Sequence, residues 1–326
     1  MNLYPLKFKT IYKDKIWGGN KVRTILNKDF SPLPNCGETW EISGVQNEIS
    51  IVENGPLAEN NLQELIEIYM GELVGDHIYE KYGIEFPLLI KFIDANDNLS
   101  IQVHPNDELA KERHNAYGKT EMWYVIEAEK GSKLNSGFCK NVSKEEYLKH
   151  LENNTITDVL NYEEVKAGDV FFMPAGRVHA IGKGILLTEI QQTSDITYRI
   201  YDYNRIGTDG KPRELHTELA IDAIDYNYYD KYRTNYSTEL NKTSSIIQCN
   251  YFNTNILEFD AIIEKDYGYI DSFVIFICLE GTFTIIDDNN SKTEINKGET
   301  ILLPSVLKNI ALIPKIKSKI LEVFIK

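Results

Sequence analysis

Residues 86–124 read FPLLIKFIDANDNLSIQVHPNDELAKERHNAYGKTEMWY, and this stretch decides the fold that we expect. Within it, Ser100, Gln102 and His104 occupy every second position, so a β-strand would project their side chains to one face. The apolar residues that alternate with them project to the other face: Leu99, Ile101 and Val103. Pro105 ends the strand because proline cannot donate a ladder hydrogen bond. The pattern predicts a strand with one apolar face and one polar face.

Two later strands supply further polar side chains. Glu121 stands directly before the apolar run at 122–126. Residues 163–180 read EEVKAGDVFFMPAGRVHA, which predicts strand, turn and strand, with His179 following a Pro-x-Gly corner. If these strands line one β-barrel, four side chains converge as metal ligands: Gln102, His104, Glu121 and His179.

Two imidazoles, one carboxylate and one amide oxygen are a ligand set that suits zinc, with iron, manganese and cobalt as alternatives. We expect one divalent ion per chain. A single carboxylate leaves such an ion with about one net positive charge, which favours an oxygen that becomes negative during a reaction.

The sequence contains an internal repeat. Residues 296–304 (NKGETILLP) resemble residues 166–174 (KAGDVFFMP), and an apolar strand precedes each copy, at 122–131 and 273–281. A repeated β unit predicts two similar β-barrels.

The two copies differ where the metal site is expected. His179 lies eleven residues after Gly168, whereas Asn309 lies eleven residues after Gly298. Residues 250–326 contain no histidine. The second barrel is therefore expected to be structural and to lack metal ligands.

Helical patterns lie near 60–82 and 143–161, the second opening with a capping box of Ser143 and Glu146, and an amphipathic helix covers 213–225. The tyrosine-rich tract from Tyr226 to Tyr236 suits interdomain packing, with sugar stacking as the alternative. The predicted domains are a catalytic domain at 1–212, a helix and linker at 213–240, and a second barrel at 241–326. The predicted fold is mainly β, with two jelly-roll-like barrels and a few added helices.

Composition limits the function. The 326 residues include 35 basic and 49 acidic residues, a net charge of −14, which argues against a nucleic-acid surface. The four scattered cysteines form no CxxC pair, as expected for reduced thiols rather than disulfides or a thiolate zinc site. No stretch reaches the roughly 18 apolar residues of a membrane span, and the N-terminus has no apolar h-region. We expect a cytoplasmic protein without a membrane partner.

Four segments resemble the short bacterial form of type I mannose-6-phosphate isomerases: FPLLIK at 86–91, LSIQVHP at 99–105, KTEM at 119–122 and RELH at 213–216. These are zinc-dependent cupin enzymes, so the resemblance implies two cupin barrels and the same four zinc ligands. Longer members carry a histidine where this chain has Gly118, so that histidine cannot be the indispensable base here.

The resemblance also implies further site residues. The catalytic candidates are Arg199, Glu189 and Asp195, and the substrate-binding candidates are Lys119, Ser100 and Lys91. From the residues alone, Lys91 could instead be a strand lysine snorkelling at a barrel rim. Arg199 could form an ion pair with Asp195 or Asp202.

The implied reaction interconverts mannose 6-phosphate and fructose 6-phosphate through a cis-enediol(ate). Glu189, Asp195 and a metal-bound water are left open as the group that moves the proton. A cupin dioxygenase with iron and a sugar-phosphate-binding regulator are the rival functions. We expect a sugar-phosphate substrate, and the sequence leaves a monomer or a homodimer open.

Overall fold

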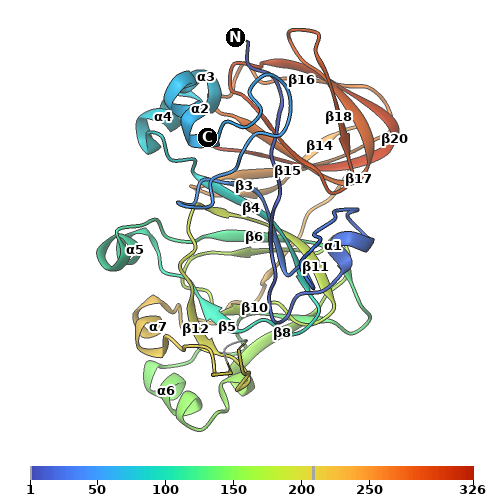
Figure 1. The fold of residues 1–326 in the computed structure, drawn as a ribbon. Helices are drawn as coiled ribbons and strands as arrows, with labels where there is room; N and C mark the ends of the chain where they lie inside the picture. Colours follow the sequence, from blue (N-terminus) through green and yellow to red (C-terminus); the bar gives the residue numbers. More distant parts are fainter. Residues whose placement is uncertain (1, 208–209) are drawn as a thin grey trace.

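The computed structural model describes residues 2–207 and 210–326. It is mainly β, as predicted, with three antiparallel sheets and seven short α-helices in the described chain. Figure 1 shows the sheets layered from the five-stranded sheet at the bottom to the eight-stranded sheet at the top. None of the three strand orders closes on itself, so the two predicted β-barrels are built from open sheets, two in the first half and one in the second.

The five-stranded sheet runs in the order β12 (Tyr198–Tyr201), β5 (Ile101–Val103), β10 (His179–Ala180), β7 (Lys133–Phe138), β8 (Leu160–Glu164). The seven-stranded sheet runs β13 (Arg233–Thr234), β9 (Val170–Met173), β6 (Glu121–Ala128), β11 (Ile185–Gln192), β4 (Leu88–Ala95), β3 (Glu38–Ser43), β2 (Ile11–Lys13). The eight-stranded sheet runs β1 (Leu6–Lys7), β19 (Thr300–Leu303), β17 (Val274–Ile286), β20 (Asn309–Phe324), β15 (Asn253–Phe259), β14 (Thr243–Gln248). Two strands lie off this path: β16 (Ile263–Asp266) on β20 and β18 (Lys292–Asn296) on β17.

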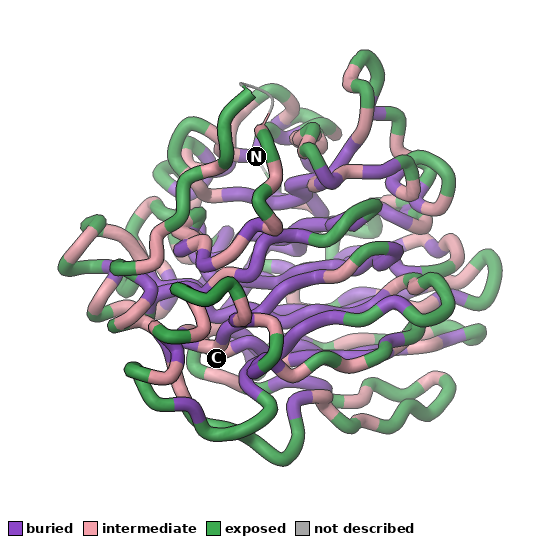
Figure 2. Tube along the Cα trace, turned by 90° about the horizontal axis from the view of Figure 1, so that it is seen from below, coloured by how far each residue is buried: buried purple, intermediate pink, exposed green. Residues whose placement is uncertain are grey.

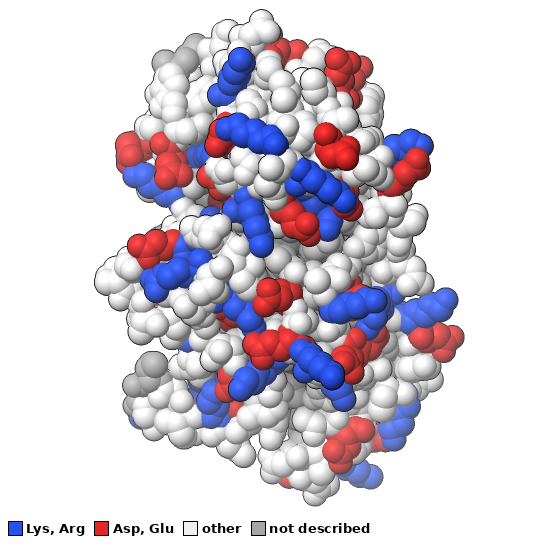
Figure 3. Space-filling model, turned by 90° about the vertical axis from the view of Figure 1, so that its right-hand side faces the viewer, with Lys and Arg blue, Asp and Glu red and all other residues white. Residues whose placement is uncertain are grey.

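The helices are α1 (Lys21–Thr24), α2 (Leu62–Tyr69), α3 (Gly71–Val74), α4 (Asp76–Tyr82), α5 (Asp107–His114), α6 (Lys144–Glu152) and α7 (Thr217–Ala223), with a 3₁₀ helix η1 at Ile156–Val159. None of the described helices is long and apolar enough to cross a membrane. On the face in Figure 3, basic and acidic side chains are interspersed and form no large patch of one sign.

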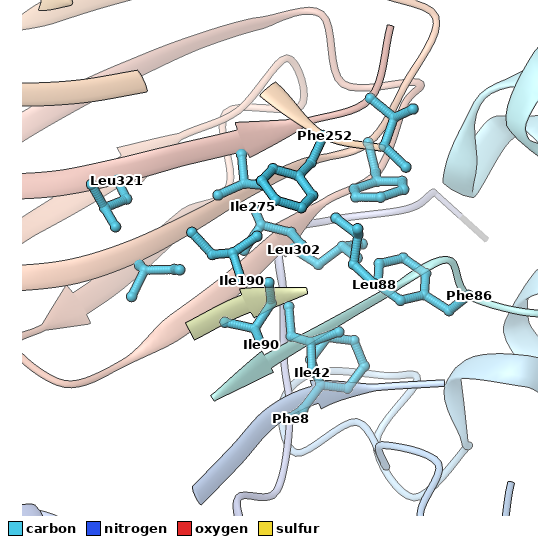
Figure 4. Packing of buried hydrophobic residues seen from close by; sticks show 14 of the residues in the cluster. Phe8, Ile42, Phe86, Leu88, Ile90, Ile190, Phe252, Ile275, Leu302 and Leu321 are labelled. Atoms are coloured by element: carbon cyan, nitrogen blue, oxygen red, sulfur yellow. The ribbon is translucent and has the colours of Figure 1, made fainter. Parts of the chain in front are cut away.

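The seven-stranded sheet is buried on both faces. Along β6, Met122 and Tyr124 belong to the core shared with the eight-stranded sheet, whereas Trp123 and Val125 face the interior shared with the five-stranded sheet. Figure 4 shows the first of these cores, where residues of β3, β4 and β11 meet residues of β17, β19 and β20. In Figure 2 the buried residues accordingly follow the strands, and most exposed residues lie in the connections.

The internal repeat is visible as two copies of one turn. Gly168 has φ +89° and its N–H donates to Val125 O at 2.8 Å; Gly298 has φ +83° and its N–H donates to Cys278 O at 2.8 Å. In each copy the strand after the turn pairs with the apolar strand that opens the copy, β9 with β6 and β19 with β17. The repeat in the sequence is therefore also a repeat in the structure.

The helix predicted over 60–82 is divided into α2, α3 and α4. The chain breaks at Met70, with φ +46°, and at Gly75, with φ +101°. The break lets this segment bind the eight-stranded half: the Asp271 carboxylate accepts from the N–H groups of Asp76 at 2.9 Å and His77 at 3.0 Å. A long-range contact, which periodicity does not encode, therefore overrides the continuous helix.

Other expectations need smaller corrections. The helix predicted over 143–161 ends at Glu152, and Ser143 caps it by accepting from Glu146 N–H at 3.1 Å. Leu99 lies before β5 and packs in the interior, not on the outer face with Ile101 and Val103. The predicted domain borders stay a prediction; strand β1 joins the eight-stranded sheet and β13 joins the seven-stranded sheet.

Candidate metal centre and active site

The predicted metal ligands come from both sheets of the first half and meet between them. Gln102 lies on β5, His104 follows β5, Glu121 opens β6 and His179 opens β10. The ligand atoms of His104, Glu121 and His179 lie within 4.8 Å of one another, and all three residues are buried. Strand pairing places His179 directly opposite Gln102. The structure thus brings all four predicted ligands together.

Both histidines are held in the tautomer that a metal requires. His104 Nδ1 donates to Ile196 O at 2.9 Å, and His179 Nδ1 donates to Arg177 O at 2.8 Å. Because a carbonyl can only accept, each Nδ1 carries the proton and each Nε2 presents a lone pair. Each Nε2 lies 3.4 Å from a carboxylate oxygen of Glu121.

The electrostatics keep the three groups unprotonated. Burial and the Lys119 ammonium lower the pKa of His104 to about 3, and burial lowers the pKa of His179. Burial alone would raise the pKa of Glu121, but Lys119 and the two imidazoles hold it well below its usual range. Two neutral imidazoles and one carboxylate are the protonation states in which these side chains bind a metal.

The donor set fits a metal ion in two further ways. Neither carboxylate oxygen of Glu121 accepts a hydrogen bond from the described residues, although the group is fully buried. Gln102 Nε2 lies 3.2 Å from His179 Nε2, and a half-turn of the amide puts its oxygen in that place. Because the Lys119 ammonium lies beside Oε2, Oε1 is the buried acceptor that no cation of the described chain satisfies, and such an acceptor is costly.

Lys119 contacts this ligand group directly. Its Nζ lies 2.9 Å from His104 Nε2 and 2.9 Å from Glu121 Oε2, and the contact with Glu121 is an ion pair without hydrogen-bond geometry. The side chain is 4% exposed, so its charge is held inside the protein. Lys119 therefore contacts the metal ligands as well as lining the cavity.

A cavity of about 300 Å³ opens beside the ligands. It is lined by every predicted catalytic and substrate-binding residue: Lys91, Ser100, Lys119, Glu189, Asp195 and Arg199. It is also lined by residues that were not predicted from the sequence: Lys15, Trp17, Glu38, Thr197 and Arg213. Arg213 belongs to the RELH segment at 213–216, so the family resemblance could have identified it. No pattern in the sequence marks Lys15 or Glu38 as site residues.

Lys91 and Glu189 form a buried pair across β4 and β11. Lys91 Nζ lies 3.2 Å from Glu189 Oε1, and Trp123 Nε1 donates to Glu189 Oε2 at 2.9 Å. Burial and the Glu121 carboxylate raise the pKa of Glu189. Lys91 is 4% exposed and lines the cavity, so the alternative of a lysine snorkelling at a rim is wrong.

Glu38 contributes a second carboxylate beside Lys91, at 4.0 Å. Burial alone would raise the pKa of Glu38, but Lys91 and Lys15 hold it at about 2. Glu38 is therefore ionised at neutral pH, whereas Glu189 is the carboxyl of this cavity whose proton affinity is increased.

Arg199 lies on β12 at the cavity wall, and its guanidinium donates to Glu214 O at 2.8 Å. Asp202 is bound by Arg205 at 2.9 Å and by Arg213 at 2.7 Å, so the ion pair considered for Arg199 with Asp202 is not formed. Burial and the neighbouring Arg213 lower the pKa of Arg199. A half-buried guanidinium beside a second positive charge favours an anionic ligand.

Comparison with known proteins assigns the family. The profile of the phosphomannose isomerase type I catalytic domain matches residues 5–132. Mannose-6-phosphate isomerase ManA of Bacillus subtilis is 36% identical over 315 residues, which covers 93% of this chain and 94% of that protein. The mannose-6-phosphate isomerase of Streptococcus mutans is 43% identical over 220 residues, 68% of this chain and 67% of that protein. The chain belongs to the type I mannose-6-phosphate isomerase family.

Solved structures agree with the family assignment. The crystal structure of mannose 6-phosphate isomerase from Bacillus subtilis matches with a TM-score of 0.89 at 31% identity and covers 98% of this chain and 99% of that chain. A mutant phosphomannose isomerase from Salmonella typhimurium matches at 14% identity with a TM-score of 0.78, which shows the shared fold. As a member of this family, the protein is an enzyme of the isomerase class.

Proposed function

We propose that the protein interconverts mannose 6-phosphate and fructose 6-phosphate at this cavity, with a divalent metal, zinc, held by Gln102, His104, Glu121 and His179. The observation that carries the proposal is the buried, unprotonated ligand group behind a cationic cavity that Gln102 and Lys119 line. When bound, the metal would polarise and hold the substrate oxygens at the reacting carbons.

The charge of the cavity suits a sugar phosphate. Its lining has five cationic side chains and three carboxylates, so two positive charges are in excess: Lys15, Lys91, Lys119, Arg199 and Arg213 against Glu38, Glu189 and Asp195. We assign Lys119, Ser100 and Lys91 to substrate binding, with Ser100 at the phosphate and Lys119 beside the metal ligands that it contacts. Binding energy from the phosphate then positions the distant reacting carbons.

Glu189 is the group that we assign to proton transfer. The reaction removes the proton from C2 of the open-chain aldose, moves the hydroxyl proton from O2 to O1 in the cis-enediol(ate), and returns a proton to C1. A base for this step needs a pKa closer to neutrality than that of an ordinary carboxyl, and burial and Glu121 raise the pKa of Glu189. Trp123 and Lys91 fix its two oxygens, while Arg199 and Asp195 orient the substrate at the reacting end.

The test is conversion of mannose 6-phosphate to fructose 6-phosphate by zinc-loaded protein, by chelated protein and by His179→Ala. We expect turnover in the first and loss in the other two, with re-added zinc restoring the chelated wild type alone. No turnover despite bound zinc would contradict the isomerase. Turnover that survives His179→Ala would contradict the ligand set.

A further inference from the structure

We propose that Arg177 is a positioning residue for the metal centre, and that Tyr229 and Tyr232 hold it there by stacking on its guanidinium. This role rests on the metal centre proposed above. It gives the tyrosine-rich tract a function besides packing, namely retention of the metal. Arg177 does not line the substrate cavity, so the role is separate from substrate binding.

The turn at residues 174–177 contacts two metal ligands, His179 and His104, and also Thr120, the residue before a third. The carbonyl of Arg177 accepts from His179 Nδ1 at 2.8 Å, and the N–H of Gly176 donates to His104 O at 2.9 Å. The N–H of Ala175 donates to the hydroxyl of Thr120, the residue before Glu121, at 3.2 Å. A displacement of this turn would therefore reach both imidazoles and the carboxylate strand.

The side chain of Arg177 leads away from the ligands to the tyrosine-rich tract. Its Cζ lies 4.7 Å from the ring centroid of Tyr229 and 4.8 Å from that of Tyr232. The guanidinium forms no ion pair with a carboxylate of the described chain. Two aromatic faces, which attract a cation through their quadrupoles, therefore hold its position.

The tract itself is anchored on the first half of the molecule. Tyr232 is buried, and its hydroxyl donates to Phe138 O at 2.8 Å and accepts from the N–H of Tyr229 at 3.1 Å. The Tyr229 hydroxyl donates to Asp225 Oδ2 at 2.7 Å, and the N–H of Asp225 donates to Gly176 O at 2.8 Å. The tract and the residue before it, Asp225, thus contact the same turn twice, through the main chain of Asp225 and through the Arg177 side chain.

The physical consequence concerns how firmly His179 is oriented. A ligating imidazole binds best when the acceptor of its other N–H is fixed, and loss of such outer partners typically lowers metal affinity by about 10- to 100-fold. Without the stacked guanidinium, the Arg177 carbonyl keeps only the main-chain contacts of its turn. Metal release should then accelerate while the ligands themselves remain unchanged.

The experiment uses cobalt as the probe. Cobalt-loaded wild type, Arg177→Met and Arg177→Lys are mixed with excess chelator, and both the release rate and the visible absorption of the bound cobalt are recorded. We expect Arg177→Met to release cobalt about tenfold faster, with an altered absorption band, since it keeps the aliphatic stem and removes the stacked cation. Arg177→Lys keeps the charge without the planar group, so its cobalt release rate should lie between those of the wild type and Arg177→Met.

Arg23→Met is the matched control. Arg23 also stacks on an aromatic ring, with its Cζ 4.1 Å from the ring centroid of Phe30, and it lines no part of the cavity. It should release cobalt at the wild-type rate. If folded Arg177→Met releases cobalt at the wild-type rate and has the wild-type absorption spectrum, the role of Arg177 alone is overturned. If Arg177→Met does not fold, the same result in Arg177→Lys overturns it. A wild type that takes up no cobalt would overturn the metal centre and this role with it.

Discussion

The two halves of the repeat place a buried glutamate at the same point of the fold. In the first half, β11 sets Glu189 opposite Trp123 on one neighbour and Lys91 on the other. In the second half, β20 sets Glu322 opposite Phe276 and Asn255. Both glutamates are nearly inaccessible, at 3% and 2% exposure, so the fold accommodates a buried carboxylate in either half.

The neighbours of the two glutamates differ. Glu322 is satisfied by Lys265 Nζ at 2.8 Å, the Tyr267 hydroxyl at 2.5 Å and Asn255 Nδ2 at 2.7 Å. Glu189 Oε1 forms an ion pair with Lys91 at 3.2 Å but accepts no hydrogen bond from the described residues, and Glu189 lines a cavity. A saturated carboxylate stabilises a fold, whereas one with free capacity beside a cavity is available for chemistry.

The metal-ligand positions show the same contrast. Counting strand register from the paired turns, Val274 stands where Glu121 stands, and Asn309 stands where His179 stands. Asn309 is exposed, whereas His179 is buried. One scaffold therefore carries a ligand group in its first copy, whereas its second copy has a buried valine and an exposed asparagine at the corresponding positions.

The largest expected effect separates His179 from Asn309. His179→Ala should abolish metal binding and turnover, whereas Asn309→Ala should keep the wild-type metal content and rate. Metal content by elemental analysis and turnover of mannose 6-phosphate measure both. Loss of metal in Asn309→Ala would mean that the second half participates in the site.

Glu189→Gln comes next. We expect kcat to fall by about 10²- to 10⁴-fold, the usual contribution of a positioned acid–base group, with metal content preserved. The amide keeps an acceptor for Trp123 Nε1 but removes the charge that pairs with Lys91 Nζ at 3.2 Å, so the unfolding temperature should also fall. A variant with near-wild-type kcat would exclude Glu189 as the group that moves the proton and leave Asp195 as the carboxyl to test.

The pH dependence sharpens the same assignment. A base must be ionised, so activity should fall as pH decreases through the pKa of Glu189. Because burial raises that pKa, the acidic limb should lie above the pKa of an ordinary glutamate, about 4.3. The kcat profile of Glu322→Gln should retain this limb, and an unchanged limb in the residual activity of Glu189→Gln would contradict the assignment.

Glu322→Gln should affect stability and not catalysis. The amide weakens the ion pair with Lys265 and places an NH₂ group near donors, so we expect a loss of about 1–3 kcal/mol in the free energy of unfolding. Urea titration measures the loss, and kcat at a temperature below unfolding should equal that of the wild type. A drop in kcat without a change in stability would give the second half a catalytic role.

Much of this comparison could be predicted from the sequence. The repeat, the alternation around Gln102 and the absence of histidine after residue 250 are local patterns, and they predicted the mainly β fold and a ligand group confined to the first half. The cluster around Glu322 could not be predicted, because its partners come from β15 and β16 and meet only through sheet register. The break at Met70 and the contribution of Glu38 to the cavity depend on long-range contacts in the same way.

The smallest expected effect distinguishes the two turns of the repeat. Alanine at Gly168 or Gly298 would adopt a positive φ, which costs about 1–2 kcal/mol. A β-carbon at Gly168 meets nothing closer than the Tyr236 hydroxyl at 3.5 Å, whereas at Gly298 it would lie 2.6 Å from the main-chain oxygen of Leu26. Gly298→Ala should therefore lose more stability than Gly168→Ala, by about 1 kcal/mol, in paired urea titrations. Equal losses would show that the segment containing Leu26 yields readily, and that the turn conformation alone sets the cost in both halves.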